Sequence, residues 1–219
     1  MSVKLTSDSI QVSESIGSVS CEVMEPPSMR AMLVFAHGAG AGMNHPFMVK
    51  VSAALAEASV GTIRFNFPYM EQKKKRPDVA PVAEKTVSAL LDFAAATFKD
   101  TPLFAGGKSF GGRMTSQLLS KENTFTLKGI VFFGFPLHPA GKPSIDRAEH
   151  LHKIQLPMLF LQGTRDALAV MNLMEPLCNT IPIATLTKFE GADHAFHVPR
   201  KDLIPLLAQE ASEWMIARL

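Results

Sequence analysis

The sequence has little excess charge of either sign and very few cysteines. Twenty-two Lys and Arg residues stand against 20 Asp and Glu residues, a net charge of +2. This charge is too small to indicate a nucleic-acid partner or an anionic membrane surface. The two cysteines, Cys21 and Cys178, lie far apart in the sequence. They exclude a disulfide framework and a cysteine zinc site, and they suit a reducing compartment.

Long apolar runs are missing as well. No run approaches the roughly 18 residues that a membrane-spanning helix needs, so no membrane span is expected. The first eleven residues include Ser, Thr and Asp where a signal peptide would be apolar, which predicts a cytoplasmic protein. Hydrophobic residues nevertheless make up 47% of the 219 residues, and charged residues only 19%. This composition supports a large core and predicts a single domain over residues 1–219.

Short apolar segments alternate along the chain with amphipathic ones. The apolar segments predict buried strands, and the spacing in the amphipathic segments predicts helices. Residues 3–23 predict one or two edge strands. The other strands are expected at 31–36, 61–67, 102–105, 129–135, 157–162 and 184–189, and the helices at 47–58, 82–98, 113–120, 168–178 and 203–219. The alternation indicates an α/β fold with a mostly parallel central sheet and helices on both faces, and ligands bind such sheets beyond the carboxyl ends of the strands.

A Gly-x-Ser-x-Gly pattern, residues 107–111, follows one of these apolar runs and precedes a helical segment. In this context the serine, Ser109, stands at a sharp turn with its hydroxyl exposed. Positions 107 and 111 require small residues, here Gly107 and Gly111, because larger side chains would collide with the neighbouring strand and helix. A phosphate-binding loop would need a glycine where Pro102 stands, so that alternative is poor. An ordinary glycine-rich turn is the other alternative.

A serine hydroxyl needs a base to become a nucleophile, and the base needs an acid to orient it. Asp166 comes shortly after a predicted strand, and His194 comes shortly after the last one. The chain order Ser109, Asp166, His194 is the order expected of the α/β-hydrolase fold. We therefore predict these three residues as the catalytic residues.

Alternatives stay open for the two partners of the serine. Asp166 is alternatively only a helix N-cap, a position that aspartate often takes. Asp146 is the competing acid, although it precedes a helical turn rather than following a strand. His197 competes with His194 as the base. Asp193 is interpreted as a loop residue, because neighbouring side chains usually diverge.

An oxyanion hole would need two backbone donors. We expect one from Phe110, which follows the serine, and the other from Ala39 in the glycine loop 38–40. His37, which precedes that loop, is interpreted as a structural hydrogen-bonding residue rather than a base. The basic run 73–76 is interpreted as a solvated loop. Candidates for an acyl pocket, with plain core as the alternative, are Met43, His45, Phe47, Phe135, Leu137 and Met171.

The motifs together resemble those of a known family. The matching segments are residues 35–40, 65–69, 106–113, 162–166 and 191–194. They are similar to the hydrolases that include testis-expressed protein 30 and the hydrolase-like region of NSL histone-acetyltransferase complex subunit 3. The resemblance implies a small α/β-hydrolase fold with no large cap domain, and the same Ser109, Asp166 and His194 assignment. The size resembles that of dienelactone hydrolases, but their usual nucleophile is cysteine, which argues against a lactone substrate.

The sequence therefore predicts a serine hydrolase that cleaves carboxylic esters or thioesters through an acyl-enzyme on Ser109, with no metal and no organic cofactor. The segment from Phe135 to Pro157 is too short for a lid, so an open, shallow site and a small-molecule or exposed ester or thioester substrate are expected. Two alternatives remain: a non-catalytic interaction module on a hydrolase fold, and acyl transfer to an acceptor other than water by the same triad. The oligomeric state is left open.

Overall fold

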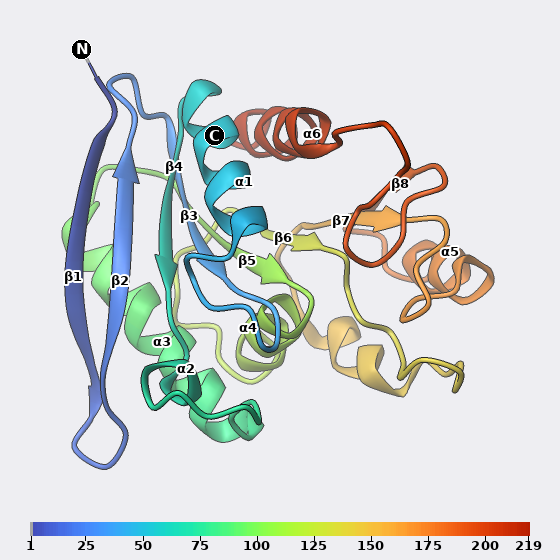
Figure 1. The fold of residues 1–219 in the computed structure, drawn as a ribbon, viewed down its shortest axis with the longest axis horizontal. Coiled ribbons are helices and arrows are strands. Elements are labelled where there is room, and N and C mark those ends of the chain that lie inside the picture. The colour runs from blue at the N-terminus through green and yellow to red at the C-terminus, as the bar shows by residue number, and fades with distance from the viewer. Residues whose placement is uncertain (1) are drawn as a thin grey trace.

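The computed structural model describes residues 2–219, in which eight strands form one sheet. The sheet is twisted (Figure 1). The strand order is β1-β2-β4-β3-β5-β6-β7-β8. The strands are β1 (Lys4–Ser13), β2 (Gly17–Glu25), β3 (Ala31–Ala36), β4 (Val60–Phe65), β5 (Leu103–Lys108), β6 (Ile130–Phe133), β7 (Met158–Gly163) and β8 (Ala184–Phe189). The β1–β2 and β2–β4 pairs are antiparallel, and the remaining pairs are parallel.

Helices cover both faces of this sheet (Figure 1). They are α1 (Pro46–Glu57), α2 (Pro68–Glu71), α3 (Ala80–Thr97), α4 (Phe110–Leu119), the 3₁₀ helix η1 (Asp146–Lys153), α5 (Met171–Asn179) and α6 (Ile204–Ile216). Because side chains alternate along a strand, β3 supplies both core layers. Leu33 and Phe35 join the cluster formed with α1 and α6, whereas Met32 and Val34 join the cluster formed with α3, α4 and α5.

Over residues 2–219 the predicted fold class is confirmed: an α/β-hydrolase fold with a mostly parallel sheet, helices on both faces and no large cap. Between β6 and β7, where a cap would be inserted, the regular structure is η1, which packs against α4. Within residues 2–219, no helix combines the length and the apolar character that a membrane crossing requires.

Several predicted boundaries are wrong by a few residues. The strand expected to end at residue 105 runs to Lys108, and the helix expected from residue 113 begins at Phe110. Two glycines explain the longer strand. A Cβ on Gly106 would collide with the Val131 carbonyl, and a Cβ on Gly107 would lie 2.5 Å from the Ala36 oxygen. These residues are strand glycines because neighbouring backbone approaches them closely.

Candidate active site

Ser109 occupies the turn between β5 and α4 with a strained backbone. Its φ is 50° and its ψ is −114°, a conformation that residues with a Cβ rarely adopt. A Cβ on Gly111, in the first turn of α4, would lie 2.5 Å from the Ala36 oxygen. Gly111 therefore allows the first turn of α4 to pack in close contact with β3. The strained turn holds the serine side chain at the carboxyl edge of the sheet.

The structure brings Ser109, His194 and Asp166 into one chain of hydrogen bonds. The Ser109 Oγ lies 2.8 Å from His194 Nε2, and His194 Nδ1 lies 2.6 Å from Asp166 Oδ2. A carboxylate can only accept, so Nδ1 carries a hydrogen and donates it to Asp166. In the neutral ring this leaves Nε2 as the acceptor of the serine hydroxyl. The three side chains are separated by up to 85 positions in the sequence.

Asp166 is held by two further donors. The Gln162 side-chain amide donates to Asp166 Oδ2 at 2.6 Å, and the Leu168 backbone N–H donates to Oδ1 at 2.7 Å. Gln162 is itself fixed, because its Oε1 accepts the Phe135 N–H at 2.9 Å. Gln162 and Asp166 are almost completely buried. From the sequence, no role was predicted for Gln162. The feature that could have indicated one is a lone amide side chain at the end of an apolar strand, four positions before the acid.

The competing acid lies elsewhere, and Asp193 has the loop role that was expected of it. Asp146 stands in the first turn of η1 and is exposed. Asp193 accepts the N–H groups of Ala195 and His197 through its Oδ1, as a loop residue does. Within residues 2–219, no group of three or more His, Cys, Asp or Glu side chains is arranged to hold a metal ion.

The glycine loop after β3 is oriented by His37. The His37 Nδ1–H donates to the Gly38 carbonyl at 2.7 Å, while His37 Nε2 accepts the Phe67 N–H at 3.1 Å. The Gly38 carbonyl also accepts the Ala41 N–H at 3.3 Å. Because a trans peptide is planar, its carbonyl and the next N–H point in opposite directions. The Ala39 N–H therefore points away from His37.

The next amide in the loop is already engaged. The Gly40 N–H donates to the Tyr69 hydroxyl at 2.9 Å, and Tyr69 is fully buried. Of the two neighbouring amides, Gly40 is thus committed to protein, whereas Ala39 stands on a cavity wall together with Ser109. Phe110 is the first residue of α4, and first-turn amides have no partner within a helix.

His37 makes the folded state sensitive to acid. Burial lowers its pKa from 6.5 to about 4, and protonation of Nε2 would also break the bond from Phe67. Between these two values the unfolded chain binds more protons, so stability rises with pH. The stabilisation is complete above about pH 6.5 and is lost as the pH falls to about 4, by about 3 kcal/mol at most.

This expectation is testable by urea unfolding between pH 7.5 and 4. His150 should add a similar loss of stability, because burial and nearby cationic side chains also lower its pKa to about 4. The variant His150→Asn should keep only the contribution of His37, and a stability that stays flat across this range would contradict the assignment.

A cavity of about 330 Å³ opens beside Ser109 and His194. Its walls are mostly small or apolar, and its lining residues are Gly38, Ala39, Ala41, His45, Phe47, Met48, Lys108, Ser109, Leu168, His194 and Ala195. Of the six predicted pocket residues, His45 and Phe47 line it. Phe135 and Leu137 are buried core on the other face of the sheet, so for them the core alternative holds.

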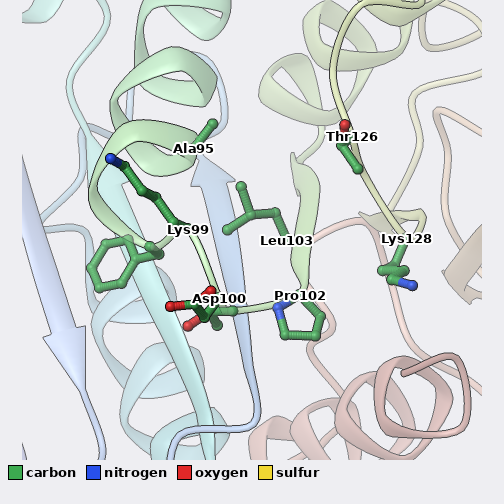
Figure 2. Close-up of a pocket in the computed structure, with 9 residues that line it drawn as sticks. Ala95, Lys99, Asp100, Pro102, Leu103, Thr126 and Lys128 are labelled. Atoms are coloured by element: carbon green, nitrogen blue, oxygen red, sulfur yellow. The ribbon is translucent and has the colours of Figure 1, made fainter.

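A larger hollow of about 470 Å³ lies away from this chemistry. It is formed where α3 ends and β5 begins, with Lys99, Asp100 and Pro102 on one side and Thr126 and Lys128 on the other (Figure 2). This is the amino end of β5, opposite Ser109. Substrates of parallel sheets bind at carboxyl ends, so the smaller cavity is the candidate site.

Comparison with known proteins agrees with this fold. The sequence profile of a family described as an alpha/beta hydrolase domain matches residues 29–212. The chain belongs to this family. Similarity of this α/β hydrolase to the narrower group around testis-expressed protein 30 stays a prediction.

Solved structures and curated sequences give more distant matches. The dienelactone hydrolase of Anabaena variabilis has a TM-score of 0.81 at 21% identity, with both chains fully covered. A Xanthomonas campestris serine hydrolase without a lid has a TM-score of 0.75 at 18% identity, covering 98% of this chain and 96% of that one. Two Mycobacterium tuberculosis proteins, provisionally named phosphoribosyl transferases, are 26% identical over 221 residues. The match covers 98% of this chain and 47% of each of them, so the chain spans about half their length.

Proposed function

We propose that this α/β hydrolase is a serine hydrolase that cleaves carboxylic esters or thioesters through an acyl-enzyme formed on Ser109. The observation that carries the proposal is the unbroken chain of short hydrogen bonds from Ser109 through His194 to Asp166. Ser109 and His194 line a cavity that is open to a substrate. Such a chain of hydrogen bonds is the arrangement by which a weak nucleophile is activated near neutral pH.

In this mechanism Ser109 Oγ attacks the carbonyl carbon while His194 Nε2 takes the hydroxyl proton. The imidazolium that forms donates its Nδ1–H to the Asp166 carboxylate, which stabilises the positive charge. When the tetrahedral intermediate collapses, Nε2 returns the proton to the departing alcohol or thiol, and the acyl group stays on Ser109. A water molecule, deprotonated by His194, then releases the carboxylic acid by the same steps in reverse.

The negative charge on the carbonyl oxygen needs two donors, for which we assign the backbone N–H groups of Ala39 and Phe110. Support for Ala39 comes from its neighbours: Gly38 turns its carbonyl towards His37, and the Gly40 N–H is used by Tyr69. Support for Phe110 comes from its place at the start of α4, where the helix dipole also favours negative charge.

The shape of the cavity favours a small acyl group. Its volume of about 330 Å³ is at the lower end of small-molecule sites, and its walls carry mostly alanine and apolar side chains. We therefore assign short, weakly polar acyl groups. The name of the mycobacterial relatives describes proteins about twice this length, and we assign phosphoribosyl transfer to the part that this chain does not match.

The test is labelling of the folded protein with a fluorophosphonate probe, followed by hydrolysis of p-nitrophenyl esters and acyl-CoA thioesters of graded length. Modification of Ser109 and fastest turnover of short acyl chains are the expected results. A folded protein that is neither labelled nor active would instead favour the non-catalytic interaction module.

Replacing Tyr69 by phenylalanine should lower kcat about tenfold and leave KM nearly unchanged. The substitution removes the buried hydroxyl that accepts the Gly40 N–H, so the glycine loop loses the contact that fixes its orientation. Tyr69 is the single tyrosine of the sequence. Thr86→Val, which removes a buried hydroxyl bonded to Val82 on α3, is the matched control and should keep wild-type kcat. Equal kcat for Tyr69→Phe and wild type would contradict the proposed loop orientation.

A further inference from the structure

Lys108 is the last residue of β5 and immediately precedes Ser109. Its side chain lines the same cavity, and its Cγ lies 3.5 Å from the place that a Cβ would take on Gly38. The Nζ then reaches across the site and donates a 2.6 Å hydrogen bond to the backbone carbonyl of His194. A lysine beside a serine nucleophile thus contacts the residue proposed as its base.

The surroundings of the ammonium group hold it in place. Its Nζ lies 5.4 Å from the centre of the Phe196 ring and 5.8 Å from that of Phe47, and these two rings stack on each other. Ring faces attract cations at such distances. Gly134 leaves room for the group, because a Cβ there would lie 3.0 Å from Nζ.

We propose that Lys108 is a positioning residue of the hydrolase, whose ammonium group fixes the His194 backbone so that Nε2 stays within reach of Ser109. The inference rests on the proposed serine hydrolase function. A charged donor makes a shorter and stronger hydrogen bond than a neutral one. The distance of 2.6 Å fits such a bond. The strand that carries the nucleophile is thereby tied directly to the loop that carries the base.

The strength of the hydrogen bond between Lys108 and the His194 carbonyl should depend on pH. Burial lowers the pKa of Lys108 from 10.5 to about 8, although the carboxylates of Asp166 and Asp193 act in the opposite direction. The other titratable groups on this cavity are the imidazoles of His194 and His45. The elements that pack against the ammonium group are α1 and the loop after β8, and they contribute the uncharged rings of Phe47 and Phe196. Above about pH 8 the neutral amine donates a weaker bond, so activity should fall along an alkaline limb.

The experiment compares wild type with Lys108→Met, Lys108→Gln and the surface control Lys50→Met, using kcat, KM and the rate of fluorophosphonate labelling from pH 6 to 10. The Met variant should lose kcat about tenfold at pH 7, keep KM within about twofold and show no limb near pH 8. At high pH, where the lysine is neutral but still donates, wild-type activity should fall to that of the Gln variant and stay above that of the Met variant. The Gln variant, a neutral donor, should lose less and also lack the limb, and the control should behave as wild type.

Other results would overturn the inference. These are a wild type without a limb near pH 8, a Met variant with wild-type kcat, or a variant that raises only the KM of anionic substrates and so reveals a substrate contact. If Lys108→Met does not fold, the Gln variant decides by the same criteria. A wild type that is not labelled at Ser109 refutes the proposed function itself, whereas equal labelling rates in wild type and the Lys108 variants refute only the role of the lysine.

Discussion

Replacing Ser109 with alanine is expected to remove fluorophosphonate labelling and to lower kcat for short p-nitrophenyl esters by about 10⁴- to 10⁶-fold. The reason is that no acyl-enzyme can form without the Oγ, whereas the proposed Ala39 and Phe110 donors remain and still favour attack by water. The fold should survive, since Ser109 Oγ makes no hydrogen bond as an N-cap of α4. Kinetics with each ester, and mass spectrometry of the labelled protein, measure both effects.

The chain offers a matched control for this variant. Ser116, also on α4, has its Oγ 2.7 Å from His150 Nε2, so it forms a second serine–histidine pair. That hydroxyl already donates to the Arg113 carbonyl at 3.0 Å and is buried away from the cavity. Ser116→Ala should therefore keep labelling and kcat and lose about 1 kcal/mol of stability. Persistent labelling of Ser109→Ala at another residue would contradict the assignment of the nucleophile.

The fold was largely predictable because its signals are local. Fully buried strands such as β3 and β7 are bounded by turns, and the helices between them carry one apolar face. The boundaries around Ser109 were less predictable, because a glycine in a strand and a glycine in a turn look alike in a sequence. Gly106 and Gly107 belong to β5 only because β6 and β3 pack so closely against them. That is a tertiary constraint.

The candidate site was likewise predictable in one part and not in another. Parallel strands end at one edge, so chain order alone suggested that Ser109, Asp166 and His194 would meet. The partners of the residues that support them could not be predicted in this way. Tyr69 lies 29 positions after Gly40, and Gln162 lies 27 positions after Phe135, whose amide it binds. Such contacts depend on how α2 and β7 are placed in space, which no local pattern encodes.

Replacing Asp166 with asparagine is expected to lower kcat about 10⁴-fold while leaving KM little changed. Asp166 Oδ2 accepts from both His194 and Gln162, and Oδ1 accepts from the Leu168 N–H. An asparagine that keeps its oxygen towards Leu168 must turn its NH₂ towards His194 and Gln162. The histidine would then have to present an unprotonated Nδ1 to that group, which places the hydrogen on Nε2. In that tautomer Nε2 cannot take the proton of Ser109.

The measurement is kcat at neutral pH together with the labelling rate, and Asp146→Asn serves as the control because Asp146 was the competing acid in the sequence. The control should retain wild-type activity, since Asp146 lies exposed in η1. Gln162→Leu should lie between the two, because it removes one donor to Asp166 and leaves the carboxylate in place. An Asp166→Asn enzyme within tenfold of wild type, or a larger loss in the Asp146 control, would mean that another group orients His194.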